Sequence, residues 1–305
     1  MEDVEQGGAA PEVAPVPAPA SMSKVAPTPA RTATAVEPVS PISSAPAPTA
    51  TLVVMRHGSS AWTDAAVNRF AGWVDVPLSD TGRAQASHAG ELLRAAGIAP
   101  DACFTSLLRR SIVTADIVLD AVDRLWVPVQ RSWRLNERHY GAFQGQTRPA
   151  MRAAYGEERF AAYRRAYGVR PPEIEVDSPY YQGSDARYRQ PDGLGGPDPA
   201  AIRCESLADL SARLDPFWRT SVEPLLAVGQ CVLVVTHGSV VRAIRMRLEG
   251  ISPEHIREVN IPTGVPLAYT FTTEGERPQV VGTGRYLDEA AARAGIADVT
   301  RLGRA

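Results

Sequence analysis

Two histidines in the sequence share a local pattern: each is separated by one polar residue from a short apolar stretch and directly precedes a glycine. The first stretch, residues 51–55, leads into Arg56-His57-Gly58, and the second, residues 231–235, leads through Thr236 into His237-Gly238. An imidazole can attack phosphorus as a nucleophile, an arginine fork suits phosphate oxygens, and a glycine lets backbone N–H groups approach a ligand closely. The pattern therefore indicates phosphoryl-group chemistry centred on His57. A lone Arg-His-Gly tripeptide is explained as well by a histidine that only caps a strand.

Both apolar stretches predict buried strands that open into loops at their carboxyl ends. Ligands bind at such ends in open α/β sheets, so the repeated pattern predicts both imidazoles at one crevice. Between the two stretches, Ser79 or Asp80 is the predicted N-cap of a helix that ends at Gly97. Strands are predicted over 102–105 and 127–130, with a helix over 107–123 between them. This alternation predicts an α/β layered domain with a largely parallel sheet.

Residues 147–200 interrupt the alternation. Two short helical pieces are predicted over 151–155 and 157–167, followed by a loop rich in proline, glycine and tyrosine. A long irregular segment in a compact domain is typical of a lid or a binding wall, and a solvated excursion is the alternative. Beyond it we predict, in order, a helix over 206–222, closing strands over 265–271 and 279–281, and a short helix over 287–297 before a mobile tail.

Composition restricts the class of protein. Residues 1–50 are rich in proline, alanine, serine and threonine, which predicts a disordered extension, and their acidic, proline-broken start does not fit a signal peptide. A formal net charge of −2 predicts no nucleic-acid partner. The three cysteines have neither paired nor metal-ligand spacing, which indicates reduced thiols in a cytoplasmic protein. No stretch approaches the roughly 18 apolar residues of a membrane span, so no membrane partner is expected.

The sequence resembles the histidine phosphatase superfamily and, within it, the phosphoglycerate mutases that depend on 2,3-bisphosphoglycerate. The motifs that carry the resemblance run from about Thr51 to the C-terminal tail: Arg56-His57-Gly58, Phe70-Ala71-Gly72-Trp73, Leu78-Ser79, Thr105-Ser106, Arg110, Leu-Asn-Glu-Arg-His-Tyr-Gly at 135–141, Gln144-Gly145, Arg164-Arg165, His237-Gly238 and Asn-Ile-Pro-Thr-Gly-Val-Pro-Leu at 260–267. The resemblance implies a three-layer α/β/α fold with a mostly parallel sheet. It further implies a catalytic domain over residues 51–285, with 147–200 as an active-site insertion and 286–305 as a C-terminal tail.

The resemblance also implies roles for individual residues. His57 matches the histidine that becomes phosphorylated, and Glu137 matches the general acid and base. Arg56, Arg110 and His237 match the phosphate pocket. The positions implied to bind substrate are Ser60, Ala71, Gly72, Arg138, Tyr140, Arg148, Arg164, Arg165, Gly238 and Ser239.

Two features of the implied substrate positions stand out. Adjacent arginines on a helix face two directions, so spacing alone favours a solvated charged surface for Arg164 and Arg165, whereas the resemblance favours the substrate site. Arg148 stands where the family usually has lysine, which keeps the charge and changes its geometry. Ser59, Thr63, Ala71 and Ser239 replace residues that the family commonly has as Glu, Asn, Thr and Asn; these departures are expected to lower the ratio of mutase to phosphatase activity.

The function implied by the resemblance is interconversion of 2- and 3-phosphoglycerate, as in glycolysis and gluconeogenesis. The reaction passes through a phosphohistidine primed by 2,3-bisphosphoglycerate and uses no metal. The implied partners are small phosphorylated glycerates and other copies of the chain, in a dimer or tetramer. One alternative is a phosphatase of the same superfamily acting on bisphosphoglycerate or another small phosphate ester. A second alternative is a non-catalytic protein that binds a phosphorylated ligand.

Overall fold

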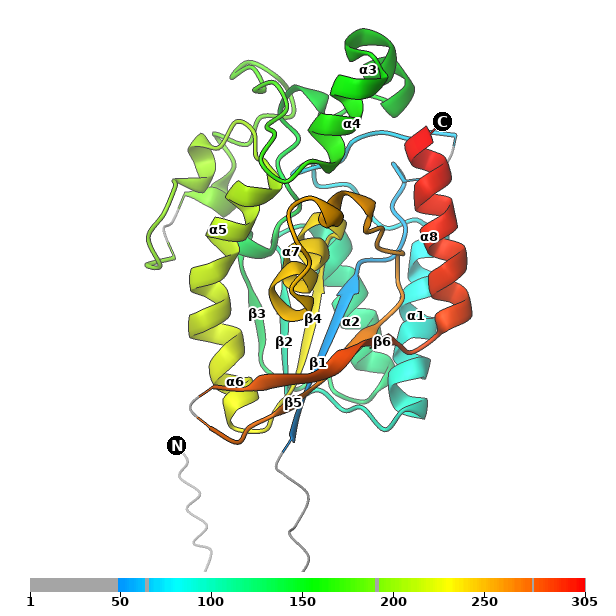
Figure 1. Ribbon diagram of the computed structural model, residues 1–305, viewed down its shortest axis with the longest axis vertical. Helices are drawn as coiled ribbons and strands as arrows, with labels where there is room; N and C mark the ends of the chain where they lie inside the picture. Colours follow the sequence, from blue (N-terminus) through cyan, green and yellow to red (C-terminus); the bar gives the residue numbers. More distant parts are fainter. Residues whose placement is uncertain (1–48, 64–65, 190–191, 276, 305) are drawn as a thin grey trace, which may run out of the picture. The chain divides into compact units, whose positions relative to one another are not determined.

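The computed structural model describes residues 49–63, 66–189, 192–275 and 277–304, and its centre is a six-stranded sheet (Figure 1). The strand order is β3-β2-β4-β1-β5-β6. Strands β1 to β4 run parallel to one another. Strand β5 pairs antiparallel with β1 on one side and with β6 on the other. The strands are β1 (Thr49–Arg56), β2 (Ala102–Thr105), β3 (Val129–Arg131), β4 (Cys231–Thr236), β5 (Leu267–Thr272) and β6 (Gln279–Tyr286).

Helices cover both faces of this sheet (Figure 1). The α-helices are α1 (Asp80–Ala95), α2 (Arg109–Ala121), α3 (Arg148–Tyr155), α4 (Glu157–Arg165), α5 (Leu207–Phe217), α6 (Glu223–Ala227), α7 (Gly238–Glu249) and α8 (Glu289–Arg304). Shorter helical turns are η1 (Trp133–Leu135), η2 (Gly141–Phe143), η3 (Ala186–Tyr188), η4 (Pro199–Ala201), the π-turn η5 (Trp218–Val222) and η6 (His255–Glu258). Helices α3 and α4 lie beyond the carboxyl ends of the parallel strands (Figure 1).

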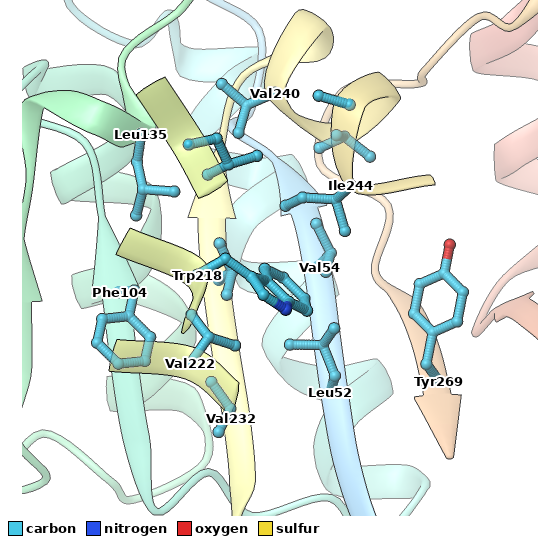
Figure 2. Packing of buried hydrophobic residues seen from close by; sticks show 14 of the residues in the cluster. Leu52, Val54, Phe104, Leu135, Trp218, Val222, Val232, Val240, Ile244 and Tyr269 are labelled. Carbon is cyan, nitrogen blue, oxygen red and sulfur yellow. The ribbon is translucent and has the colours of Figure 1, made fainter. Parts of the chain in front are cut away.

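The alternation of side chains along β1 explains the layers. Leu52 and Val54 pack into one apolar cluster with residues of α5 and α7, part of which is drawn in Figure 2. Val53 and Met55 point to the opposite face and pack with residues of α1 and α2. Because successive side chains of a strand face opposite ways, an uninterrupted apolar stretch requires cover on both faces. The predicted three-layer α/β/α class with a mostly parallel sheet is confirmed.

Both predicted boundaries of the domain shift in the structure. Strand β1 begins at Thr49, and Ala50, placed by the sequence in the extension, is buried and pairs with Phe271 of β5. The rest of the predicted disordered extension lies outside the described residues. Strand β6 runs to Tyr286, so it crosses the predicted start of the tail.

The predicted short helix with a mobile tail is wrong in extent, because α8 continues to Arg304. Its last turn is held by side chains from distant segments. The amide of Asn68 donates to the Leu302 carbonyl at 3.4 Å, and Arg164 Nη1 donates to the Gly303 carbonyl at 3.0 Å. These bonds satisfy carbonyls that a helix end leaves without partners inside the helix.

Candidate active site

Strands β1 and β4 place the two predicted histidines side by side. Arg56 at the end of β1 pairs with Thr236 at the end of β4, and the His57 N–H donates to the Thr236 carbonyl at 2.9 Å. The rings of His57 and His237 lie with their centroids 5.0 Å apart, and both are buried. Neighbouring parallel strands end at the same edge of a sheet, which is why two distant segments deliver their imidazoles to one place.

The surroundings of His57 fix which nitrogen is available for chemistry. Nδ1 lies 2.6 Å from the Gly58 carbonyl, which can only accept a hydrogen bond, so Nδ1 carries the proton. Nε2 therefore keeps its lone pair, and Arg110 Nε donates to it at 3.2 Å. Burial, followed by the charges of Arg110 and Arg56, lowers the pKa of His57 well below its usual value. The imidazole is neutral at neutral pH, as a nucleophile must be.

Gly58 has a different role from the one expected. Its N–H donates to Thr114 Oγ1 at 3.2 Å and is directed into the protein, so the expectation that it approaches a ligand is wrong. A Cβ atom at Gly58 would lie 2.1 Å from the Gly82 carbonyl oxygen. The glycine is required because the first turn of α1 packs directly against the backbone after β1.

Two arginines flank His57, Arg110 fully buried and Arg56 partly buried. Arg110 donates through Nη1 to the Val74 carbonyl at 2.8 Å and through Nη2 to the Gly72 carbonyl at 2.7 Å, so its guanidinium is fixed beside the imidazole. Arg56 Nη1 donates to the Ile261 carbonyl at 3.0 Å, and its buried Nε has no partner among the described residues. Burial lowers the pKa of Arg110 to about 10, which leaves it cationic at neutral pH. Both side chains can stabilise an anion at this point.

His237 is held through one nitrogen. Its Nε2 lies 2.8 Å from Ser106 Oγ, and that hydroxyl already accepts the Leu108 N–H at 3.1 Å. When the serine hydroxyl donates to Nε2, the imidazole proton of His237 lies on Nδ1. Nδ1 is buried and has no partner within the part of the chain that the structure describes. A buried donor without a partner costs about 1–3 kcal/mol, a cost that an incoming phosphoryl oxygen would remove.

Glu137 follows η1 and is fixed through one carboxylate oxygen. Oε1 accepts the backbone N–H of Arg138 at 2.8 Å and that of Ser239 at 3.1 Å. In the described part of the chain, these hydrogen bonds leave Oε2 without a partner. Oε2 is thus the oxygen that can deliver or receive a proton.

These groups border a cavity of about 100 Å³ whose wall carries seven arginines and one carboxylate. The cavity is lined by Arg56, His57, Ser60, Thr63, Arg69, Phe70, Ala71, Gly72, Arg110, Glu137, Tyr140, Arg148, Arg164, Arg165, Gly238, Ser239, Arg242, Ile261 and Val299. His237 is buried behind this wall. With this excess of positive charge, the cavity suits a small ligand that carries several negative charges.

Comparison with known proteins places the chain in a family. The family model of the histidine phosphatase superfamily (branch 1) matches residues 52–182 and 182–283. A protein of Bifidobacterium longum named 2,3-bisphosphoglycerate-dependent phosphoglycerate mutase is 48% identical over 253 residues, which cover 83% of this chain and 98% of the relative. A Mycobacterium tuberculosis protein of the same name is 48% identical over 256 residues, which cover 84% and 98%. The chain belongs to this mutase family of the histidine phosphatase superfamily.

Solved structures share the fold at lower identity. A mycobacterial glucosyl-3-phosphoglycerate phosphatase in complex with VO3 superposes with a TM-score of 0.56 at 23% identity, covering 78% of this chain and 96% of that chain. A structure named mycobacterial hydrolase 2 superposes with a TM-score of 0.57 at 21% identity, covering 81% and 98%. These similarities establish the superfamily fold alone.

Arg138 is the exception among the predicted substrate residues of this mutase family member, since it does not line the cavity. It is fully buried, and its Nη2 donates to the carbonyls of Tyr163 at 2.9 Å and Arg164 at 3.0 Å. Its guanidinium carbon lies 4.6 Å from the centre of the Tyr140 ring. Arg138 therefore holds the end of α4 and Tyr140 in place from behind the cavity wall. Its buried Nε and Nη1 have no partner among the described residues, and its contact with substrate stays a prediction.

Arg69, Arg242 and Val299 line the cavity and were missed by the sequence analysis. Arg242 had a detectable signal, because it lies three and four residues after Ser239 and Gly238 on α7 and so shares their face. Arg69 precedes a recognised motif but has no distinguishing spacing. Val299 comes from α8, and no local pattern connects that helix to the site.

Other arginines that line the cavity repel one another. Burial first, and then neighbouring arginines, lower the pKa of Arg148 to about 10 and those of Arg164 and Arg242 to about 9. Arg165 donates to the Val259 carbonyl at 3.3 Å and to the Asn260 side chain. Arg148 donates to Asn68 Oδ1 at 2.6 Å. These bonds hold several positively charged guanidinium groups at the wall of one cavity, an arrangement that an anionic ligand stabilises.

The four departures from the usual family residues do not all reach the cavity. Thr63, Ala71 and Ser239 line it. Ser59 does not, and its Oγ lies 3.3 Å from Thr263 Oγ1. The expectation that the Ser59 departure alters a contact near the substrate is therefore not supported by its position. The described residues contain no group of three or more His, Cys, Asp or Glu placed for a metal ion, and none of their helices is long and apolar enough to cross a membrane.

Replacing His237 with alanine is expected to slow phosphoryl transfer by about 100-fold while changing substrate affinity less. A preorganised donor to the transferring group contributes roughly 3 kcal/mol in the transition state. Single-turnover kinetics of phosphoenzyme formation measure the transfer step, and equilibrium titration measures binding. Unchanged transfer in the His237→Ala protein would remove this residue from the site.

The three buried histidines make stability depend on pH. Burial lowers the pKa of His57 and His237, and that of His139 to about 4. Below about pH 6.5 the unfolded chain binds protons that the native protein does not, so stability falls as pH falls through this range. We expect a loss of about 2 kcal/mol per buried histidine between about pH 7.5 and pH 5. Urea unfolding at both pH values measures it, and His139→Gln should remove roughly a third of the loss; equal stability at both pH values would contradict the prediction.

Proposed function

We propose that this chain is a phosphoglycerate mutase that interconverts 2- and 3-phosphoglycerate through a phosphohistidine at His57. The observation that carries the proposal is one small cavity that combines a neutral histidine with several arginines. His57 and Arg110 line this cavity, and so do Arg148, Arg164 and Arg165. A phosphoglycerate carries two anionic groups, one of them the phosphoryl group to be transferred. The mutase relatives at 48% identity support the same conclusion.

The proposed reaction uses the groups in fixed order. Nε2 of His57 attacks phosphorus, the N–P bond forms, and the bond from phosphorus to the glycerate oxygen breaks. Glu137 Oε2 gives its proton to the departing oxygen, and Arg56, Arg110 and His237 stabilise the charge on the phosphoryl oxygens. In the second half, the other glycerate hydroxyl attacks phosphorus and Glu137 takes the proton back. Both half-reactions balance without a further reactant.

The priming phosphoryl donor we propose is 2,3-bisphosphoglycerate. Several buried nitrogen atoms that have no partner among the described residues fit a ligand with several phosphate oxygens; they include Nδ1 of His237 and the Nε atoms of Arg56 and Arg242. When bound, this molecule supplies the phosphoryl group that His57 carries. We propose that no metal takes part, because the seven arginines of the cavity wall provide the positive charge that phosphoryl transfer requires.

A coupled assay tests this function. Conversion of 3-phosphoglycerate to 2-phosphoglycerate is followed through added enolase, with and without 2,3-bisphosphoglycerate. We expect turnover that rises strongly with the bisphosphate. Release of inorganic phosphate without conversion would instead identify a phosphatase, the outcome favoured by the short side chains of Ala71 and Ser239 on the wall. Tight binding without either product would indicate a non-catalytic binder.

We further propose that the protein acts in the cytoplasm as a homo-oligomer whose basic unit is a dimer. Strand β3 forms an edge of the sheet, and the loop before it exposes Leu125 and Trp126 by 57% and 72%. An open edge beside exposed apolar side chains is a surface that a second copy can cover. Sedimentation analysis is expected to show a dimer or tetramer, with dissociation in Trp126→Glu; a monomeric wild-type protein would exclude the proposal.

A further inference from the structure

A buried arginine on α5 contacts the backbone that carries Glu137. Arg213 is 2% exposed. Its Nη1 donates to the carbonyls of Trp133 at 3.3 Å and Arg134 at 2.5 Å. Its Nη2 donates to the carbonyls of Asn136 at 2.9 Å and Glu137 at 3.0 Å. One guanidinium thus fixes four carbonyls of a five-residue segment that ends at the proposed acid.

Glu205 completes this contact on the other side of Glu137. Its Oε1 accepts Arg213 Nε at 2.6 Å, and its Oε2 accepts Arg213 Nη2 at 3.0 Å. Oε2 also accepts the backbone N–H of His139 at 2.8 Å. The pair therefore bonds to the backbone both before and after the Glu137 side chain. We refer to Arg213 and Glu205 together as the Glu137 clamp.

A stabilising role alone does not account well for the clamp. Burying an ion pair costs desolvation energy that its attraction often fails to repay, so such a pair is weak evidence for stability. Residues 136–140 have no regular secondary structure that could fix them. A proton-transfer group needs its atoms held within about 0.5 Å of the productive position. A rigid, bidentate contact on both sides meets that need.

We propose that the Glu137 clamp is the positioning element for proton transfer by Glu137. The proposal rests on the proposed role of Glu137 as the acid and base. Within the described part of the chain, the cavity wall includes neither Arg213 nor Glu205, so both act through the backbone of Glu137 and not on the substrate. Their removal should affect only steps that need the proton.

Two phosphoryl donors separate those steps. When 2,3-bisphosphoglycerate phosphorylates His57, the departing glycerate oxygen needs a proton from Glu137. When acetyl phosphate phosphorylates the same nitrogen, the departing acetate keeps the bonding electron pair as a stable anion and needs none. A misplaced Glu137 therefore slows the first reaction and spares the second, whereas a damaged site slows both.

The experiment measures phosphohistidine formation by rapid quench with each donor in Arg213→Lys, Glu205→Gln and Glu137→Gln. Lysine keeps the charge of Arg213 and cannot reproduce its fork. A general acid typically accelerates a reaction by roughly 10²- to 10⁴-fold. We therefore expect Arg213→Lys to lower the rate of phosphohistidine formation from bisphosphoglycerate by at least about 10-fold. The rate with acetyl phosphate is expected to stay within about threefold.

Arg245→Lys is the matched control. Arg245 also forms a two-point ion pair with a glutamate, because its Nε donates to Glu249 Oε1 at 3.0 Å and its Nη2 donates to Glu249 Oε2 at 2.8 Å. This pair lies within α7, contacts no carbonyl of the segment around Glu137 and does not line the cavity, so the ratio of the two rates is expected to stay unchanged.

Each outcome has a separate meaning. In one outcome, Glu137→Gln slows phosphohistidine formation from bisphosphoglycerate only, whereas Arg213→Lys slows the reactions with both donors equally. This outcome would overturn the clamp proposal alone. No selective loss in Glu137→Gln would overturn the proposed role of Glu137. If Arg213→Lys does not fold, Glu205→Gln decides, because glutamine keeps an oxygen for the His139 N–H and loses the charge that orients Arg213.

Discussion

Replacement of His57 by alanine is expected to abolish turnover and the acid-labile phosphoenzyme together. Among the described residues, the imidazole in contact with the His57 ring is that of His237, which does not line the cavity and is bonded through Nε2 to Ser106, so it does not present a free lone pair to phosphorus. Loss of a covalent nucleophile typically lowers turnover by roughly 10⁴-fold or more. Incubation with labelled 2,3-bisphosphoglycerate followed by acid treatment measures the phosphoenzyme, and the coupled assay measures turnover.

A matched control for this variant is His88→Ala. His88 is an exposed histidine on α1, and its Nε2 lies 3.4 Å from Asp288 Oδ2. Its removal is expected to leave both measurements unchanged. A stoichiometric phosphohistidine in the His57→Ala protein would show that another residue is the nucleophile and would contradict the assignment of the site.

Replacement of Glu137 by glutamine is expected to lower mutase turnover by about 10²- to 10⁴-fold, the usual contribution of a positioned acid or base. Glutamine has nearly the same shape, and its amide oxygen can still accept the Arg138 and Ser239 N–H groups that Oε1 accepts in the wild type. The backbone is therefore expected to stay in place while the transferable proton is lost. The loss should fall on turnover, with substrate affinity changed by less than about tenfold.

Steady-state kinetics with 3-phosphoglycerate measure this effect. Glu91→Gln is a suitable control, because Glu91 is an exposed carboxylate on α1 that contacts only His88 among the charged groups of the described residues. Wild-type turnover in Glu137→Gln would contradict a role in proton transfer. A loss confined to affinity would make Glu137 a binding residue instead.

The sequence determined the layers and the position of the reacting histidines. The apolar stretches ending in His57 and His237 are local patterns, and parallel strands must end at one edge of a sheet, so the meeting of the two rings follows from strand geometry. The N-cap at Ser79 and the strand over 102–105 follow from equally local signals. The family motifs added most of the residues that line the cavity, but not Arg69, Arg242 or Val299.

Only the tertiary structure decided what depends on contacts between distant segments. Arg138 lies in a substrate motif, yet α4 packs so that this side chain is behind the wall. Val299 reaches the cavity because the end of α8 docks on Asn68 and Arg164, more than a hundred residues away. The Glu137 clamp joins α5 to a segment that lies 76 to 80 positions earlier in the chain. Local periodicity determines which face of an element is buried, whereas the neighbour that covers that face is set only when all the layers pack together.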